Sequence, residues 1–363
     1  MPRKWHQPVA SKAASKDHQF LPVCRQDMVR RGWNELDVLL VSGDAYIDHP
    51  AFGVPLLGRL LEAHGYRVGI VAQPRWDCPD DIACLGRPRL FAGVSAGSLD
   101  SMLAHYTAFR KKRSDDAYTP GGKAGARPNR ACLVYTNLVR QAFPGLPVVL
   151  GGIEASLRRS AHYDFWADRL RRSILFDAKA DLLAYGMSEQ AVLEIAARAK
   201  RGEEWDAIRG TCSIGSPPPD AKHLPSFEQI QAEPTLLLEA TRAIEEHVHH
   251  GKQTLVQGHG QRHLIIHPPD PPLDTADLDR VYSLPFARHA HPSYTQPVPA
   301  EDMIRWSVTA VRGCGGGCTF CSLAMHQGRR LRSRSAESVL QEVRTLTKQP
   351  QWKGAISDIG GPT

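Results

Sequence analysis

Between residues 31 and 200, short apolar runs alternate with amphipathic segments. The apolar runs are rich in Val, Ile and Leu and end in small residues, as in "LDVLLVSG" from Leu36 and "PVVLGG" from Pro147. Such runs are typical of parallel strands that are buried on both faces. We predict three further strands over "YRVGIVAQP", "RLFAGVSAG" and "ADLLAYG".

The amphipathic segments between these runs predict helices. In "VPLLGRLLEAHG", one helical face carries four leucines and a glycine marks the end: Leu56, Leu57, Leu60, Leu61 and Gly65. We also predict helices over "SLDSMLAHYTAFRKK", capped by Ser98, and over "SEQAVLEIAARAK". Strands that alternate with helices predict an α/β fold, in which a Rossmann-like, doubly wound parallel sheet occupies residues 31–200.

Three other regions flank or follow this sheet. Residues 1–30 include a polar, basic start, and we predict a flexible basic tail there. Residues 201–300 are rich in proline and histidine, and we interpret them as a linker region with small strands. Regular patterning returns at residues 301–363, where "MIRWSVTAVRG" and "KGAISDIGG" predict strands on either side of a helix. That helix, over "SAESVLQEVRTLTK", has Ser335 as its cap and a buried stripe formed by Val339, Val343 and Leu346.

Two polar segments raise the question of ligand binding. Residues 110–130, "RKKRSDDAYTPGGKAGARPNR", are basic and rich in glycine but lack the spacing of a phosphate-binding P-loop, so a solvated insertion is favoured. The region 201–300 holds eight histidines without cysteine or carboxylate partners at a tight spacing, which disfavours a metal site there: His247, His249, His250, His259, His263, His267, His289 and His291.

Composition narrows the class of protein. Apolar residues make up 42% of the chain, but no apolar run is long enough to cross a membrane, and the start lacks the apolar core of a secretory signal, so we predict a cytoplasmic protein without membrane contact. The formal charge of +7 is a weak indication of nucleic acid, which stays open as a partner. Five of the eight cysteines are scattered and are interpreted as ordinary thiols: Cys24, Cys78, Cys84, Cys132 and Cys212.

The other three cysteines, Cys314, Cys318 and Cys321, lie together in "RGCGGGCTFC". A disulfide would leave one thiol over, and a closed zinc site would need a fourth ligand, for which His326 is a candidate. An iron–sulfur cluster held by only three thiolates would leave one iron open to a substrate or cofactor. The glycines around them allow the loop to curl around a compact group, and Arg312, Arg329 and Arg330 would favour an anionic cluster.

This motif resembles that of the radical S-adenosylmethionine (radical SAM) superfamily. The resemblance rests on C-x3-C-x2-C, on the aromatic Phe320 before the last cysteine, and on the β/α unit that follows. It implies that Cys314, Cys318 and Cys321 bind a [4Fe–4S] cluster whose open iron chelates S-adenosylmethionine. More narrowly, long stretches such as "HPSYTQPVPAEDMIRWSVTAVRGCGGGCTFCSLAMHQGRRLRSRS" resemble the YgiQ-type family of uncharacterised radical SAM proteins.

The resemblance also assigns roles to residues outside the cysteines. Phe320 would lie near the adenine. The superfamily has a G-G-E stretch that contacts the methionine amino group; "DIGGPT" matches it with Gly360 and Gly361, while Pro362 stands where the acid would be. The role of "HQGR", residues 326–329, does not follow from the resemblance, and neither does any catalytic residue.

The implied reaction is the one-electron reduction of S-adenosylmethionine to methionine and a 5′-deoxyadenosyl radical, which abstracts hydrogen from a substrate that the sequence does not identify. It implies an electron donor such as flavodoxin or ferredoxin as a partner. A radical SAM barrel usually has six or more strands, and residues 301–363 supply two, so we expect a chain truncated within this core that has little or no turnover alone.

Two alternatives remain. Ser95 and the pair Gly151–Gly152 resemble the serine and double glycine of cobalamin-binding domains, which would make the protein a cobalamin-dependent methyltransferase. The lower-ligand pattern D-x-H-x-x-G is absent around His49, however, so we favour a sheet kept as a docking module and an ordinary loop histidine. The second alternative is a non-catalytic zinc or iron–sulfur module that contacts nucleic acid.

Overall fold

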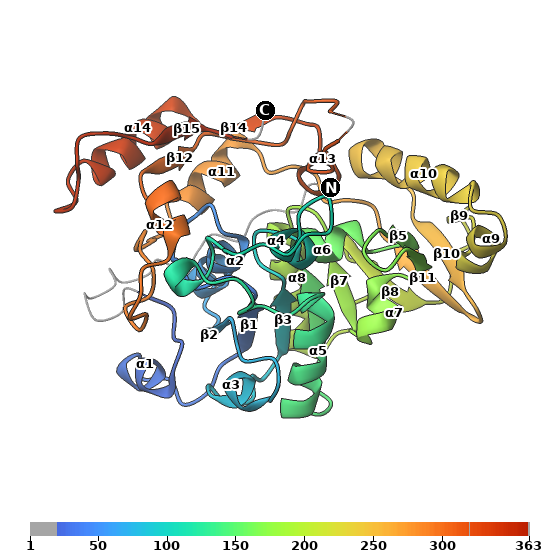
Figure 1. Ribbon diagram of the computed structural model, residues 1–363, viewed down its shortest axis with the longest axis horizontal. Coiled ribbons are helices and arrows are strands. Elements are labelled where there is room, and N and C mark those ends of the chain that lie inside the picture. The colour runs from blue at the N-terminus through green and yellow to red at the C-terminus, as the bar shows by residue number, and fades with distance from the viewer. Residues whose placement is uncertain (1–19, 319, 362–363) are drawn as a thin grey trace.

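The computed structural model describes residues 20–318 and 320–361 of the chain and is built around a nine-stranded sheet (Figure 1). Five parallel strands form its first part, in the order β2-β1-β3-β4-β7. Their bounds are β1 Val38–Ser42, β2 Val68–Ala72, β3 Phe91–Ser95, β4 Val148–Gly151 and β7 Leu182–Ala184. These are the five strands that the sequence predicts, and the predicted α/β class is confirmed.

Helices cover both faces of this parallel sheet, which explains why its strands are continuously apolar. Leu39 and Val41 of β1 pack in one core with α5, whereas Val38 and Leu40 pack in a second core with α2 and α8. Successive residues of a strand point to opposite faces, so a strand between two helical layers carries no polar face. The helices of this part are α2 Gly53–Ala63, α3 Asp80–Ala83, α4 Ser101–His105, α5 Ala131–Ala142, α6 Gly152–Leu157, α7 Ile174–Ala178 and α8 Glu189–Arg201.

The described part of the predicted N-terminal tail, residues 20–30, is folded. Residues 1–19 lie outside the described residues, but the predicted tail extends to residue 30, and its last part is folded: α1 spans Arg25–Arg30 and Leu21 is fully buried. Leu21 packs with the strands and with α2, and the carbonyl of Pro22 accepts a hydrogen bond from the backbone N–H of Ile70 (2.8 Å). An apolar side chain that reaches the core holds this segment against the sheet.

The helix after β3 is shorter than predicted. α4 begins at Ser101, and its cap is Asp100, whose carboxylate accepts from the backbone N–H of Met102 (2.9 Å). The chain then turns back on itself, with Tyr106 bridged to Lys112. Ser98 is therefore not the cap, because a carboxylate two residues later takes the free N–H groups of the first turn.

The basic insertion predicted to be solvated is partly buried. Arg127 is fully buried and forms ion pairs with Asp116 (2.9 Å) and Asp44 (3.0 Å). A short 3₁₀ turn, Pro120–Gly122, lies between the two halves of this insertion. The prediction is wrong for this part of the segment because one arginine neutralises two buried carboxylates, one of which, Asp44, lies far from it in sequence.

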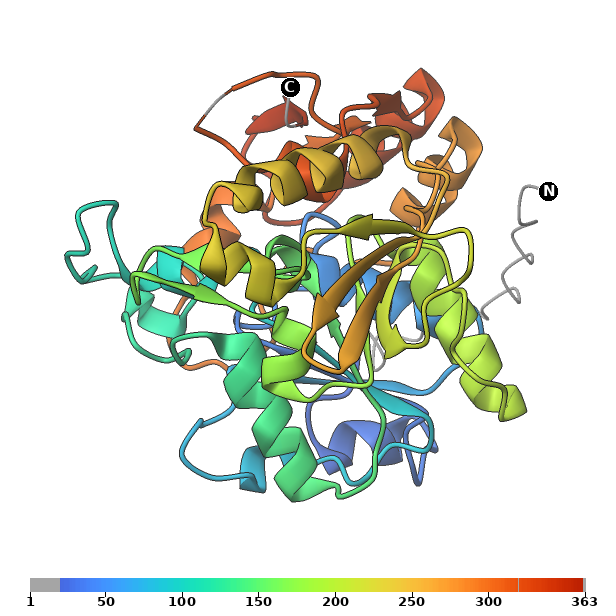
Figure 2. The same ribbon diagram turned by 90° about the vertical axis from the view of Figure 1, so that its right-hand side faces the viewer.

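Residues 201–300 continue the sheet instead of only connecting two parts. Four strands, β8 Thr211–Gly215, β9 Lys222–Leu224, β10 Leu255–His259 and β11 Arg262–Ile266, extend it in the order β7-β8-β11-β10-β9. β8 is antiparallel to β7, so the parallel run ends there. The helices of this region are α9 Phe227–Ala232, α10 Leu236–His250 and α11 Thr275–Tyr282. Earlier in the chain, β5 His162–Asp164 and β6 Arg169–Arg171 form a separate two-stranded pair. Figure 2 shows α10 between this added part of the sheet and the C-terminal segment.

The C-terminal segment lies across the upper side of the sheet in Figure 1. It contains α12 Pro299–Ile304, β12 Ser307–Thr309, β13 Val311–Arg312, α13 Ala324–Gln327, β14 Arg332–Ser333, α14 Ala336–Leu346 and β15 Asp358–Gly360. β12 and β15 pair in parallel, as two strands of a β/α unit do, and Ser335 caps α14 as predicted. The strand predicted from Met303 instead starts at Ser307, because Pro299 at the first turn of α12 favours a helix over Met303 and Ile304.

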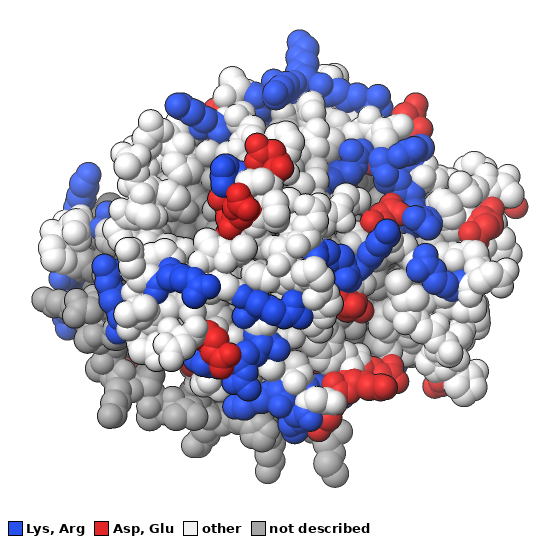
Figure 3. Space-filling model, turned by 90° about the horizontal axis from the view of Figure 1, so that it is seen from below, with Lys and Arg blue, Asp and Glu red and all other residues white. Residues whose placement is uncertain are grey.

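None of the described helices is long and apolar enough to cross a membrane. On the face opposite the C-terminal segment, Lys and Arg are spread over the surface with Asp and Glu between them, and they do not gather in one patch (Figure 3).

Candidate functional site

A cavity of about 480 Å³ lies between the carboxyl edge of the parallel strands and the strands β12 and β15. The loops that follow β1, β3, β4 and β7 line it on one side, and Ser307, Thr309, Asp358 and Gly360 line it on the other. Ligands of open α/β sheets bind at this edge because the loops there leave a crevice. The cavity is therefore the first candidate for a functional site.

Ser95 and Gly152, singled out in the sequence, meet at the wall of this cavity. Gly152 has φ +81°, and a Cβ at this position would lie 2.5 Å from Ser95 Oγ. Ser95 Oγ in turn accepts a hydrogen bond from the backbone N–H of Gly97 (3.1 Å). The two loops approach each other this closely only because residue 152 has no side chain.

Asp44, which the sequence analysis did not single out, is a buried carboxylate in the same wall. It accepts from the backbone N–H of Ser98 (2.6 Å) and pairs with Arg127 (3.0 Å). Burial raises the pKa of Asp44, and the positive charge of Arg127 acts in the opposite direction. The hydrogen bond thus fixes the loop after β1 to the loop after β3.

Arg312, which lies two residues before the first cysteine of the loop, is held by two side chains. Its guanidinium donates to Glu189, the first residue of α8, and its Nε donates to the Tyr282 hydroxyl (2.9 Å). Burial alone would lower the pKa of Arg312, but the charge of Glu189 raises it above its ordinary value. The start of the cysteine loop is thereby fixed to the carboxyl edge of the sheet.

The cysteine loop itself brings two sulfurs together. A Cβ at Gly316 would lie 3.6 Å from Cys314 Sγ and 3.5 Å from Cys318 Sγ, so both thiols flank this glycine. The backbone N–H of Leu323 points at Cys321 Sγ (3.5 Å), and all three thiols are free. Among the described residues, however, no three His, Cys, Asp or Glu side chains form a group placed to hold a metal ion.

His326 is engaged elsewhere and does not join the cysteines. Its Nδ1 lies 3.0 Å from Ser156 Oγ, which also accepts from the backbone N–H of Gly186 (3.1 Å). Burial, and then the nearby positive charge of Arg159, lowers the pKa of His326 to about 4. Because Ser156 of α6 holds its ring, His326 is poorly placed to be the fourth ligand of a zinc ion bound by the cysteine loop.

The other predicted site residues fall in different places. Gly360 lines the cavity, and its carbonyl accepts from the backbone N–H of Ala310 (2.8 Å). Gly361 lines it too, pressed so close to β13 that a Cβ would lie 2.1 Å from the Val311 carbonyl oxygen. Phe320 is 90% exposed, and Pro362 lies outside the described residues.

His49 is buried, and its Nε2 lies 2.9 Å from Arg288 Nη1. Burial, and then the charge of Arg288, holds the pKa of this imidazole well below its usual range. His49 is not among the residues that line the cavity.

Comparison with known families identifies the family of this chain. The profile of the family described as Radical SAM N-terminal matches residues 20–307. This chain belongs to that family. A UPF0313 protein of Geobacter sulfurreducens is 53% identical over 352 residues, which are 95% of this chain and 58% of that protein. A UPF0313 protein of Thermotoga maritima is 51% identical over 351 residues, covering 95% of this chain and 62% of that protein.

This member of the Radical SAM N-terminal family thus spans about three-fifths of the length of these relatives. The resemblance to the YgiQ-type radical SAM proteins is confirmed. Among solved structures, the radical S-adenosylmethionine methyltransferase TsrM of Kitasatospora setae aligns with a TM-score of 0.49 at 17% identity, over 89% of this chain and 47% of that chain. The cobalamin-dependent S-adenosylmethionine radical enzyme OxsB aligns with a TM-score of 0.43 at 12% identity, over 92% and 34%.

Proposed function

We propose that this member of the radical SAM N-terminal family binds a [4Fe–4S] cluster through Cys314, Cys318 and Cys321 and cleaves S-adenosylmethionine reductively beside the 480 Å³ cavity. The observation that carries this proposal is the position of the cysteine loop. It starts at Arg312, which lines the cavity and is fixed to Glu189 of the sheet edge. The glycine pair at the exit of β15 lines the same cavity.

The donor set fits such a cluster better than it fits zinc. Three free thiols lie in one glycine-rich loop, and two of their sulfurs already flank Gly316. The backbone N–H directed at Cys321 Sγ supplies a hydrogen bond of the kind that stabilises thiolate ligands. The histidine nearest in sequence is bound to Ser156 instead.

When bound, a cluster of this kind supplies the electron that splits S-adenosylmethionine into methionine and a 5′-deoxyadenosyl radical. This chain's residues would bind and orient the nucleotide. Ser307 and Thr309 of β12 and Asp358 and Gly360 of β15 offer hydroxyl, carboxylate and backbone groups to it. The sheet edge would close the cavity from the other side and keep water away from the reacting atoms.

Anaerobic reconstitution tests the proposal. We expect about four irons per chain and a broad absorbance that dithionite bleaches. Cys318→Ala should lose most of this iron, whereas Cys84→Ala, which removes an exposed thiol outside the motif, should keep it. Colourless protein that holds one zinc would contradict the proposal and favour the non-catalytic module that contacts nucleic acid.

The whole protein's substrate and partners are proposals as well. We propose a flavodoxin- or ferredoxin-type electron donor and, because all eight cysteines are free thiols, a reducing compartment such as the cytoplasm. Cleavage of S-adenosylmethionine should require the electron donor or dithionite, and its independence of any reductant would contradict this scheme.

A cobalamin-dependent methyltransferase is the second candidate. It is supported by Ser95, Gly151 and Gly152, which line the cavity at the position expected for a ligand of the sheet edge. Because His49 is buried against Arg288, the corrinoid would bind without this histidine as its lower ligand. Titration of the chain with hydroxocobalamin tests this: saturable binding that Gly152→Leu abolishes would support it, and no binding would exclude it.

A further inference from the structure

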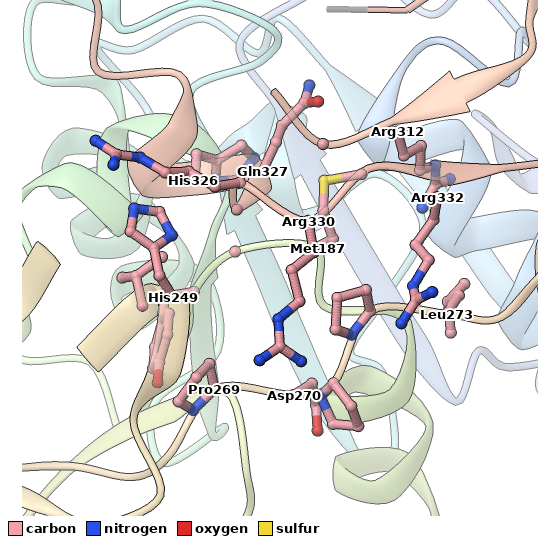
Figure 4. Close-up of a pocket in the computed structure, with 18 of the residues that line it drawn as sticks. Met187, His249, Pro269, Asp270, Leu273, Arg312, His326, Gln327, Arg330 and Arg332 are labelled. Carbon is pink, nitrogen blue, oxygen red and sulfur yellow. The ribbon is translucent and has the colours of Figure 1, made fainter. Parts of the chain in front are cut away.

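A second cavity, of about 240 Å³, shares Arg312, His326 and Gln327 with the lining of the first. Figure 4 shows residues that line it. The end of α10 forms one wall, and the loop of residues 269–273 forms another. The third wall is the segment from Met325 to Arg332, which includes "HQGR". Neither of the two candidate functions uses this cavity.

Two exposed arginines line this cavity, and their guanidinium groups have no partner among the described residues. Figure 4 shows the side chains of Arg330 and Arg332 extending toward the proline-rich loop on the opposite side. Within the described part of the chain, no hydrogen bond or ion pair satisfies either group. By contrast, the neighbouring Arg329 pairs with Glu245 (2.6 Å), and Arg209 donates to the Pro269 carbonyl (2.5 Å).

Two further side chains of the same wall have buried polar atoms that lack partners. Neither ring nitrogen of His249 has a hydrogen-bond partner among the described residues, and the same is true of Gln327 Oε1. Burial, and then the charge of Arg329, lowers the pKa of His249. Buried polar groups are normally satisfied. The His249 ring beside the two guanidiniums points to a ligand with oxygen acceptors, whereas Gln327 Oε1 would need a donor on that ligand.

The opposite wall is mostly apolar but also carries the carboxylate of Asp270. Pro269, Pro271, Pro272 and Leu273 line it, and Met187 and Met325 also line the cavity. Small-molecule sites combine an apolar lining with a few convergent polar groups in this way. A ligand that fits has an anionic end for the guanidiniums and an apolar body for the prolines.

The segment "HQGR" connects this cavity to the cysteine loop. The Gly328 carbonyl accepts a hydrogen bond from the backbone N–H of Cys314 (2.9 Å). His326 and Gln327 line both cavities, so they form a wall shared by the two. A molecule anchored in the smaller cavity would thus lie next to the larger one.

We infer that the smaller cavity binds the phosphate or carboxylate group of a small organic anion, held by Arg330 and Arg332. Planar guanidiniums bind the oxygens of both groups in pairs, which makes the two chemistries equivalent at this site. On the function proposed above, this anion is the substrate, and the binding itself requires neither cluster nor S-adenosylmethionine.

Isothermal titration calorimetry on the cluster-free 363-residue chain tests the inference, with inorganic pyrophosphate and citrate as probes. We expect saturable binding that weakens as salt is added. The double variant Arg330→Ala/Arg332→Ala should weaken binding by at least about tenfold. The control Arg30→Ala/Arg344→Ala removes the same charge from exposed sites elsewhere and should leave binding unchanged.

A tighter response to one probe identifies the ligand group as phosphate or carboxylate. Absence of saturable binding to either probe would overturn the inference, and so would equal weakening by the control variant. The conservative Arg330→Lys/Arg332→Lys variant should lie between the wild type and the alanine variant, because lysine keeps the charge without the paired geometry. Cys318→Ala, which should abolish the proposed cluster, should leave anion binding to the cluster-free chain unchanged, so the inference and the proposed cluster fail independently.

Discussion

Arg312 and Glu189, 123 residues apart in the sequence, form a buried ion pair that joins the start of the cysteine loop to the first turn of α8. Neither residue belongs to the cysteine motif. The pair nevertheless determines where the motif begins relative to the sheet, because Arg312 is held at the same time by the Tyr282 hydroxyl.

We predict that Glu189→Gln destabilises the fold by about 3–5 kcal/mol, because it leaves a buried guanidinium without its counter-charge. Chemical unfolding measures this loss. The matched control is Glu203→Gln, which removes an exposed partner of Arg201 and should change little. Equal stability of the two variants would show that the buried pair is not a structural anchor.

Gly152→Ala should destabilise the fold by about 1–2 kcal/mol, because residue 152 has a left-handed backbone conformation that alanine adopts only at a cost. The new methyl group would also clash with Ser95 Oγ, which lowers stability further. Gly202→Ala is the control, because Gly202 has φ +68° but a methyl group there would meet nothing within 4 Å. The double variant Ser95→Ala/Gly152→Ala should recover the added loss, since the contact is then removed. A double-mutant cycle, with each free energy of unfolding measured in urea, gives the coupling free energy between residues 95 and 152. A coupling of zero would contradict the clash between the alanine methyl group and Ser95 Oγ.

Stability should fall as the pH is lowered from about 6.5 toward 4, in part because of His326. Its pKa is lowered to about 4 in the fold, so between these values the unfolded chain binds a proton that the folded chain does not. Above the unfolded pKa this contribution is complete. Three other histidines with a pKa of about 4 act in the same window: His162, His247 and His259.

His326→Gln should therefore reduce the dependence of the unfolding free energy on pH between about 6.5 and 4. The comparison needs wild type and variant at about pH 5 and at about pH 8, where the histidine is neutral in both states. The stability difference between the two proteins should be smaller at the lower pH than at the higher one. A difference that is independent of pH would contradict the assignment of a neutral, buried imidazole.

Thiol labelling should divide the cysteines into distinct classes. In the folded, metal-free chain, the exposed Cys318 and Cys321 should react fast with Ellman's reagent. Cys84 should react more slowly, because burial and then the charge of Asp81 raise the pKa of its thiol. Cys132 and Cys212 should react only on unfolding, because burial raises the pKa of Cys212 to about 12 and that of Cys132 well above its usual value. Reconstitution should protect Cys318 and Cys321 but not Cys84, and unchanged labelling of all three would count against the cluster.

The sequence predicted best what depends on local spacing. The five parallel strands follow from continuous apolar runs, and the three cysteines from their separation of four and three residues. Which side chains lie around those cysteines depends on contacts between residues that are remote in sequence. One example is the contact of His326 with Ser156, which are 170 residues apart. One signal was available: Asp44 and Glu189 both follow a predicted parallel strand closely, at the edge where ligands of such sheets bind.

Each of the other differences between the predicted and the observed structure also has a physical cause. Asp100 displaced Ser98 as a helix cap because two candidate caps lie within one turn and only one can accept the free N–H groups. Small strands were predicted within residues 201–300, but their place in the sheet was not, because two of their pairings join strands remote in sequence. Arg127 looked like surface charge because its carboxylate partners, Asp44 and Asp116, come from two different loops.

The backbone N–H of Cys314 donates to the Gly328 carbonyl and so closes the cysteine loop onto the segment that forms a wall of both cavities. A ligand that holds this segment in place therefore also restrains the start of the cysteine loop at Cys314. By thermodynamic reciprocity, an anion that raises the affinity of the loop for its metal must itself be held more firmly, by the same factor, once the metal is in place.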